Sequence, residues 1–263
     1  MDTIYDRIQK NAKAVGVDFG STEMAAIIQA NNLSLAEVQA VDNVFEYLKK
    51  KKWGATVDMY LKTSRLPRKN PKTFSNFDFS QLKGKDVEVL RNLGTLAPLF
   101  AHENIAFIGP PGIGKTHLSQ AFGTECCYQG YKSYFLTFQD MNQRFTIARK
   151  TDRVASTING MVKPACLIIN EVGQCVMDKE NTRLFFDVVN RRYNKEGPGT
   201  IIFTSNVQPD QWGEFFSEDN SLLCSLDRIF DKAIICTMKG KGYRGKGRKT
   251  LAVEADASSA KAT

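Results

Sequence analysis

The feature that most constrains this chain is the eight-residue stretch 109–116, which matches the GxxxxGK(S/T) pattern of a phosphate-binding loop in full. Its residues are Gly109, Pro110, Pro111, Gly112, Ile113, Gly114, Lys115 and Thr116. An apolar run at 104–108 precedes the stretch, and an amphipathic segment follows it. A strand, a glycine-rich loop and a helix in this order are the context in which such a motif binds phosphate, so we predict a nucleotide site here.

Each residue type in this loop suits a phosphate ligand. The glycines have no Cβ, so backbone N–H groups can close around the β-phosphate. Lys115 supplies a cation for the β- and γ-phosphates, and the Thr116 hydroxyl can ligate Mg²⁺. The helix that begins there turns the positive end of its dipole toward the anion. We interpret His117 as a packing or polar contact beside the site and not as a catalytic base.

Beyond the loop, strand-like and helical segments alternate. The runs at 165–169 and 200–204 are continuously apolar, as expected for strands buried on both faces. Further strands are predicted at 133–138 and 233–237, and helices at 140–150 and around 184–192. This alternation predicts an α/β fold, a parallel sheet in a three-layer sandwich of the P-loop NTPase type. We assign this ATPase domain to residues 81–238.

Residues 1–66 are predicted to form a separate, small helical domain. Ser34 and Glu37 form a capping box that starts a helix, which we expect to stop near Gly54. A second helix is expected at 56–66, before Pro67. Together with residues 22–28, the capped helix either forms a DNA-reading helix-turn-helix or is one of two packed helices with a polar corner.

Residues 67–80 read as a linker, because proline, asparagine, serine and cations argue against regular structure. Its aromatic residues, Phe74, Phe77 and Phe79, suggest that the linker docks on a surface and does not remain free. A short helix at about 86–100 is then expected to lead into the strand before the loop.

A formal net charge of +8 and a pI near 9.1 favour a polyanionic partner. The basic clusters fall at the end of the first long helix, in and before the linker, and in the tail at 239–249, while residues 250–263 are predicted to be disordered. The candidate DNA-binding residues are Lys49, Lys50, Lys51, Lys52, Arg65, Arg68, Lys69, Lys239, Lys241, Arg244, Lys246 and Arg248. The alternative for any one run is a solvated surface.

The remaining composition points to the cytoplasm. No run of 18 apolar residues predicts a membrane span, and the first residues do not have the order of a signal peptide. The six cysteines contain no Cys-x-x-Cys pair, which argues against a zinc site, and Cys166 and Cys236 lie in apolar runs as small buried hydrophobes.

A nucleotide-hydrolysing site needs acidic groups at the end of a neighbouring buried strand. Glu171 suits the role of the base that polarises the attacking water. Asn170 stands where an aspartate would hold the Mg²⁺ shell, and its amide oxygen can still accept a hydrogen bond from Mg²⁺-bound water. We therefore expect weaker Mg²⁺ binding and slow or partner-dependent hydrolysis.

Two residues further along the chain complete the candidate catalytic set. Asn206 follows a buried strand and can orient water at the γ-phosphate, or else it caps an ordinary turn. Arg228, on a late helix, can reach a neighbouring subunit's γ-phosphate as an arginine finger, or else pair with Asp227 or Asp231.

With these motifs in order, the chain resembles the IstB-like ATP-binding proteins, helper ATPases of insertion-sequence transposition that are related to the DnaC helicase loaders in the AAA+ class. The matching residues span about 65–245: 77–79, 109–118, 130–131, 167–169 with Glu171 and Gly173, 191–193, 204–206, 226–228, and 239–240 with 243–244. The family usually has aspartate at the position of Asn170.

The resemblance implies an ATPase that uses ATP and Mg²⁺, assembles as a homo-oligomer on duplex DNA, and recruits or stimulates a transposase of the same element. It also implies that Glu171 is the Walker B glutamate, Asn206 the first sensor and Arg228 the finger, with Phe77 near the adenine. A DnaC-like helicase loader and a nucleotide-gated DNA scaffold with little hydrolysis are the alternatives.

Overall fold

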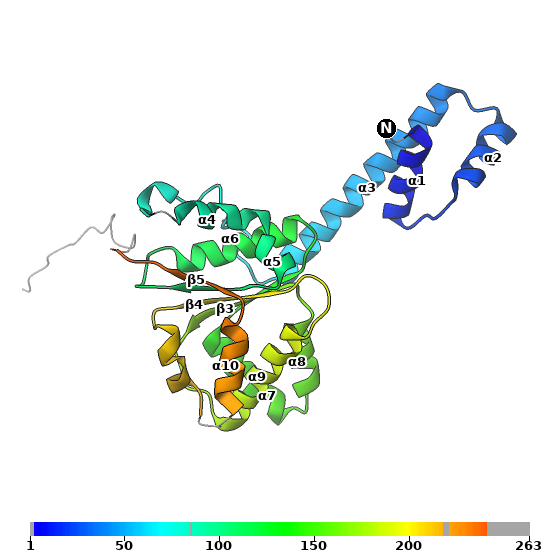
Figure 1. The fold of residues 1–263 in the computed structure, drawn as a ribbon. Helices are drawn as coiled ribbons and strands as arrows, with labels where there is room; N and C mark the ends of the chain where they lie inside the picture. The colour runs from blue at the N-terminus through cyan, green and yellow to red at the C-terminus, as the bar shows by residue number, and fades with distance from the viewer. Residues whose placement is uncertain (1–2, 85, 218–220, 241–263) are drawn as a thin grey trace, which may run out of the picture.

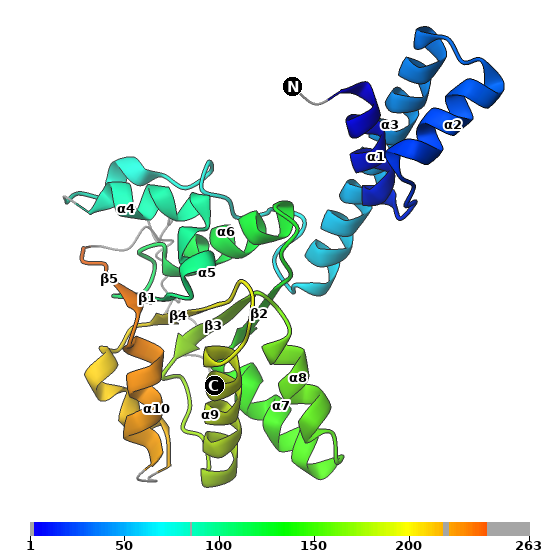
Figure 2. The ribbon, with the colours of Figure 1, turned by 45° about the vertical axis from the view of Figure 1, so that its right-hand side comes forward.

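The computed structural model describes residues 3–84, 86–217 and 221–240. An α/β domain forms most of the molecule, and one long helix, α3 (Leu35–Thr63), projects from it and carries two shorter helices at its far end (Figures 1 and 2). These are α1 (Ile4–Val15) and α2 (Ser21–Asn31).

The three N-terminal helices start and stop where their caps dictate. The predicted capping box of α3 is present, since the Ser34 hydroxyl accepts from the Glu37 N–H and the Glu37 carboxylate accepts from the Ser34 N–H at 2.7 Å. Asn32 ends α2 in the left-handed conformation, with φ of 51°. Among the described residues, the buried apolar side chains of this bundle are few: Ile8, Ala12, Met24 and Val38.

The expected break at Gly54 is wrong, because α3 runs without interruption from Leu35 to Thr63. A glycine inside a helix costs about 1 kcal/mol relative to alanine, which packing of its neighbours can offset. Here the Trp53 indole lies against Gly130 of the α/β domain, where a Cβ would overlap the ring. The separate helix predicted at 56–66 is therefore the last part of α3.

The predicted parallel sheet is confirmed. Its strands are β1 (Asn104–Ile108), β2 (Ser133–Thr137), β3 (Cys166–Val172), β4 (Thr200–Ser205) and β5 (Ala233–Thr237). All pair in parallel, in the order β2-β3-β4-β1-β5. Alternate residues point to opposite faces, so that Ile105 and Phe107 enter one core while Ala106 and Ile108 enter the other.

Helices cover both faces of this sheet, which gives three layers (Figure 1). One face carries α4 (Val87–Asn92), α5 (Ala97–Ala101) and α6 (Lys115–Tyr128). The other carries α7 (Phe138–Lys150), α8 (Val154–Val162), α9 (Lys179–Tyr193) and α10 (Ser221–Phe230). Short 3-10 turns occur at η1 (Phe79–Gln81), η2 (Leu93–Thr95) and η3 (Pro209–Phe215).

One prediction about the helices on these faces is wrong, and one helix was missed. The single helix expected at 86–100 is broken into α4, η2 and α5, because Leu96 adopts a left-handed conformation (φ 61°) and Pro98 follows at the start of α5. Helix α8 was not predicted. No helix among the described residues is long and apolar enough to cross a membrane.

Candidate functional site

The glycine-rich loop joins β1 to α6 at the carboxyl edge of the sheet. Its backbone is held on both sides, since the Gly109 N–H donates to the Ser205 carbonyl at 3.1 Å and the Met238 N–H donates to the Ile108 carbonyl at 2.7 Å. Gly109 has φ of 152°, and a Cβ there would overlap the Met238 carbonyl oxygen. A glycine is therefore required at this position for the loop to lie between β4 and the end of β5.

Lys115 opens α6 and is 7% exposed. Its Nζ donates to the carbonyl oxygens of Gly109 at 2.6 Å and Pro110 at 2.8 Å, and to Asn206 Oδ1 at 2.8 Å. The Lys115 ammonium therefore lies over the loop and contacts Asn206, the residue that follows β4. A phosphate bound by Lys115 would also lie beside the Asn206 amide.

A second set of hydrogen bonds joins the loop to β3 and β4. Asn170 Oδ1 accepts from the hydroxyl of Thr116 at 2.9 Å and from the hydroxyl of Thr204 at 2.8 Å. Asn170 is 4% exposed, so its amide is oriented by these two contacts. The Thr116 hydroxyl and the Asn170 carbonyl oxygen are neutral oxygen ligands, a donor set that fits Mg²⁺ with its retained waters.

Glu171 sits at a bulge in the β3–β4 pairing, where the register shifts between Ile169 and Val172. Its backbone is left-handed (φ 63°), and its N–H donates to the Thr204 hydroxyl at 2.9 Å. An unfavourable conformation of this kind persists only where the surroundings hold it. The bulge leaves the Glu171 carboxylate half-exposed beside the buried Asn170.

The strand order brings these groups together. Strand β4 lies between β1 and β3, so Asn206 at its end comes between the loop on one side and the Asn170–Glu171 bulge on the other. The carboxyl ends of parallel strands share one edge of the sheet, where ligands of such folds bind.

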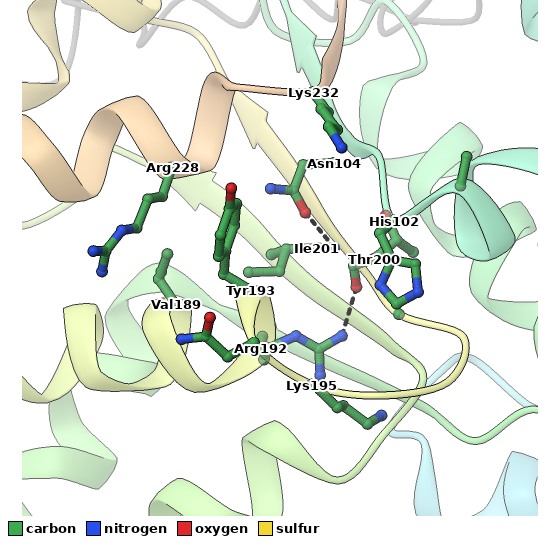
Figure 3. Close-up of a pocket in the computed structure, with 13 residues that line it drawn as sticks. His102, Asn104, Val189, Arg192, Tyr193, Lys195, Thr200, Ile201, Arg228 and Lys232 are labelled. Carbon is green, nitrogen blue, oxygen red and sulfur yellow. Dashed lines mark hydrogen bonds between the residues drawn. The ribbon is translucent and has the colours of Figure 1, made fainter.

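Arg228 lies at the opposite edge of the sheet. It is exposed near the end of α10, just before β5, and its guanidinium donates to the Asn190 side-chain oxygen on α9. It lines a cavity of about 360 Å³ with Asn104, Thr200 and Lys232, at the first residues of β1 and β4 and the residue before β5 (Figure 3). The length of β1 separates this cavity from the loop, so Arg228 does not join the site of its own chain.

Arg192 is a structural cation that sequence reasoning did not identify. It is 6% exposed, and its guanidinium donates to the carbonyl oxygens of Met161, Val162, Pro164, Ala165 and Thr200 at 2.6–3.1 Å. Burial lowers the pKa of Arg192 to about 10, so it remains charged at neutral pH. It holds together the end of α8 and the starts of β3 and β4.

The linker docks on the loop through its aromatic residues, as predicted. Phe77 lies against Gly114, where a Cβ would come within 2.7 Å of the ring, and meets the His117 ring edge-on at 5.1 Å between centroids. Phe74 covers Gly94, and Phe79 is buried with the Arg91 guanidinium 4.6 Å from its ring centroid. His117 makes polar contacts beside the site, in keeping with its predicted role.

The candidate DNA-binding cations are spread over α3 and the linker. Lys49 donates to Asn11 at 3.0 Å, and Lys50 pairs with Glu46 at 2.6 Å. Arg65 and Arg68 form longer ion pairs, with Asp140 at 3.4 Å and Asp58 at 3.5 Å. The exposed members of the set also include Lys51, Lys52, Lys69 and Lys239. Four more, and the tail predicted to be disordered, lie outside the described residues: Lys241, Arg244, Lys246 and Arg248.

Cys166 and Cys236 act as packing residues, as predicted. Cys166 is fully buried and Cys236 is half-buried, where burial raises the pKa of its thiol to about 11. In the part of the chain that the structure describes, no group of three or more histidine, cysteine or acidic side chains is arranged to hold a metal ion.

Comparison with known proteins agrees with this geometry. Residues 12–251 match the family described as IstB-like ATP binding protein. The ATP-binding protein of insertion sequence IS5376 from Geobacillus stearothermophilus is 34% identical over 221 residues, which cover 84% of this chain and 85% of that protein. Its counterpart in insertion sequence IS21 from Pseudomonas aeruginosa is 34% identical over 193 residues, covering 73% and 71%.

Solved structures show the same α/β fold. The crystal structure of DnaI has a TM-score of 0.56 at 16% identity and covers 69% of this chain and 96% of its own. The DnaC helicase loader has a TM-score of 0.53 at 16% identity, covering 64% and 97%. DnaA from Aquifex aeolicus with bound AMPPCP has a TM-score of 0.53 at 24% identity, covering 65% and 50%. The chain belongs to the IstB-like ATP-binding protein family, and its α/β domain has the fold that DnaA and the DnaC helicase loader share.

Proposed function

We propose that this protein is an ATP-hydrolysing regulator of DNA transposition. In this proposal it assembles on duplex target DNA in the ATP-bound form, acts in the cytoplasm, and recruits or stimulates the transposase of its own element. The observation that carries the nucleotide part is the contact network of Lys115, Thr116, Asn170 and Asn206 at one edge of the sheet. The transposition part rests on relatives that are named as ATP-binding proteins of insertion sequences.

Each residue at this edge has a role in the proposed reaction. Lys115 and the loop amides hold the β- and γ-phosphates, while Thr116 directly and Asn170 through a water would hold Mg²⁺. Bound Mg²⁺ would neutralise the negative charge that builds up on the phosphate oxygens. Glu171 accepts the proton of the attacking water, and Asn206, already in contact with Lys115, orients that water.

Arg228 completes the site of a second copy. Its position beside the first residues of β1 and β4, a strand's length from the loop, supports a role in trans. The cavity beside it is lined by further basic side chains, among them Lys195 and Lys232, and this favours an anionic partner surface. We infer that ATP sites form between neighbouring copies, with Arg228 acting as an arginine finger.

Duplex DNA would bind through phosphate contacts from the exposed lysines of α3 and the linker. Such contacts are independent of sequence and release counterions, so the affinity should fall steeply as salt rises. A protein that selects its targets loosely needs contacts of this kind.

Two measurements test this proposal together. Electron micrographs of the full chain with duplex DNA and a non-hydrolysable ATP analogue should show oligomers on DNA, and ATP turnover should be abolished in Glu171→Gln. DNA binding that ignores both nucleotide and salt would contradict the proposed assembly. Unchanged turnover in Glu171→Gln would contradict the assignment of the base.

A mixing experiment tests the shared site. Arg228→Ala keeps an intact loop, and Lys115→Ala keeps an intact arginine, so each alone should lose turnover while their mixture recovers part of it. The control is Arg183→Ala, which removes an exposed arginine that pairs with Glu180 on α9 and should keep wild-type turnover. A mixture with no more activity than its components would exclude catalysis by Arg228 in trans.

Asn170 favours a second candidate, a nucleotide-gated DNA scaffold with little hydrolysis. The buried amide carries no charge with which to hold the Mg²⁺ shell. A protein of this kind would assemble on DNA with ATP but show no DNA-stimulated turnover. A helicase-loader role, suggested by the fold alone, would require binding to a replicative helicase, which a pull-down with that helicase tests directly.

A further inference from the structure

Hydrogen bonds of His117, in the first turn of α6, hold a turn of the linker, residues 71–77, against that helix. Nε2 of His117 lies 3.1 Å from the Thr73 carbonyl oxygen and 2.9 Å from Asn76 Oδ1. The Asn76 amide is oriented by its other bonds, since its Oδ1 accepts from the Thr73 N–H and its Nδ2 donates to the Pro71 carbonyl. Both partners of Nε2 are therefore acceptors, so Nε2 carries the proton.

The same turn also touches the glycine-rich loop. The Phe77 ring occupies the space that a Cβ on Gly114 would need, and its edge meets the His117 ring. The turn is thus held against both parts of the phosphate site, the loop and the helix. Any side chain of this turn that points inward lies close to a bound nucleotide.

Lys72 is such a side chain. It is half-buried, and it lines a cavity of about 340 Å³ together with residues of the phosphate site: Gly112, Gly114, Lys115, Thr116, His117 and Gln120. Lys83, which lies beyond the linker, is exposed.

The charges around this cavity identify what Lys72 would bind. Two lysines, Lys72 and Lys115, line it, and no acidic residue does among the residues the structure describes. Lys115 serves the β- and γ-phosphates, whereas Lys72 directly precedes Thr73, whose carbonyl is hydrogen-bonded to His117 further along α6. This is the side toward which the α-phosphate and the nucleoside extend when the β-phosphate sits in the loop.

We propose that Lys72 binds the α-phosphate of the nucleotide. The inference rests on the proposed ATP site and adds a cation to it that the linker supplies. Because ATP and ADP share the α-phosphate, Lys72 holds both nucleotides. It also ties nucleotide occupancy to the segment that leads back to α3.

Calorimetric titration of the full chain with ADP and with a non-hydrolysable ATP analogue tests this role. Lys72→Ala should weaken both nucleotides by the same factor, about tenfold for one lost charge-assisted contact at a half-exposed site. Lys72→Arg, which keeps the charge, should retain most of the affinity. Lys83→Ala, which removes an exposed lysine beyond the linker, is the control and should bind both nucleotides as the wild type does. All three variants should unfold at the wild-type temperature without nucleotide.

The outcomes separate this inference from the proposed ATP site. Nucleotide affinities of Lys72→Ala equal to those of Lys83→Ala would overturn the role of Lys72 while leaving the ATP site intact. Loss of affinity for the ATP analogue alone, with ADP unaffected, would place the lysine at the γ-phosphate and also refute the proposal. If the wild type bound neither nucleotide, the ATP site itself would be refuted.

Discussion

Replacing Asn170 by aspartate should separate the two roles of this buried position. Its Oδ1 accepts from the hydroxyls of Thr116 and Thr204 at 2.9 and 2.8 Å, and aspartate keeps both bonds while the amide nitrogen becomes a second oxygen. The new charge is placed at a site that is 4% exposed. Its desolvation costs about 3 kcal/mol, and the two hydroxyl bonds to a charged acceptor regain about 1 kcal/mol each. The metal-free protein should therefore lose about 1 kcal/mol of stability.

With Mg²⁺ bound, the sign of the effect reverses. A hydrogen bond from metal-bound water to a carboxylate is worth about 1.4 kcal/mol more than one to an amide, which is about tenfold in affinity. In Asn170→Asp the Mg²⁺ concentration that half-saturates ATP turnover should therefore fall about tenfold, and the maximal rate should rise.

The assay is ATP turnover over a Mg²⁺ series, with urea unfolding in chelator as the stability measurement. Asn159→Asp is the control, because it adds the same charge at an exposed position on α8. If Asn170→Asp shifts neither the Mg²⁺ dependence nor the rate, the contact between Thr116 and Asn170 is not part of the metal site, and the reasoning from it is wrong.

Three further predictions concern stability. Arg192→Met should lower the free energy of unfolding, measured by urea titration, by about 3 kcal/mol or more, because five carbonyl oxygens lose a buried charged donor. Arg192→Lys should recover only part of the lost stability. Burial lowers the pKa of His117, so as the pH falls the unfolded chain binds the proton before the folded chain does. The free energy of unfolding of the wild type should therefore fall below a pH of about 6.5, and it should fall less in His117→Gln. Gly114→Ala should lower the melting temperature, because the added Cβ meets Phe77 and φ is 104°; Phe77→Leu in the same chain should relieve the clash but not the backbone strain.

Local patterns were enough to predict the phosphate loop and the strands. The span of β1 and that of β5 agree with the predicted ones, because a short apolar run bounded by polar residues indicates a strand even at the sheet edge, where β5 is only half-buried. The spacing of glycines, Lys115 and Thr116 similarly depends on eight consecutive residues. The capping box at Ser34 is also local, since its two partners are three residues apart.

Packing between distant segments controlled the remaining features. The continuity of α3 depends on Trp53 meeting Gly130, 77 positions away, so a glycine signal in the sequence pointed to a break that does not occur. The sequence also offered no sign that Arg192 is buried among carbonyl oxygens of three separate segments.

In the candidate site, too, the residue types follow from local sequence, whereas their arrangement follows from tertiary packing. Residue types and strand ends identified Lys115, Asn170 and Glu171 from the chain alone, because each follows or begins a recognisable element. Their arrangement depends on β4 entering the sheet between β1 and β3, which brings Asn206 to Lys115, and on the linker folding back to bring Lys72 to the cavity. Strand order and linker path result from helices packing on both faces of the sheet, and no short sequence pattern encodes contacts between residues so far apart.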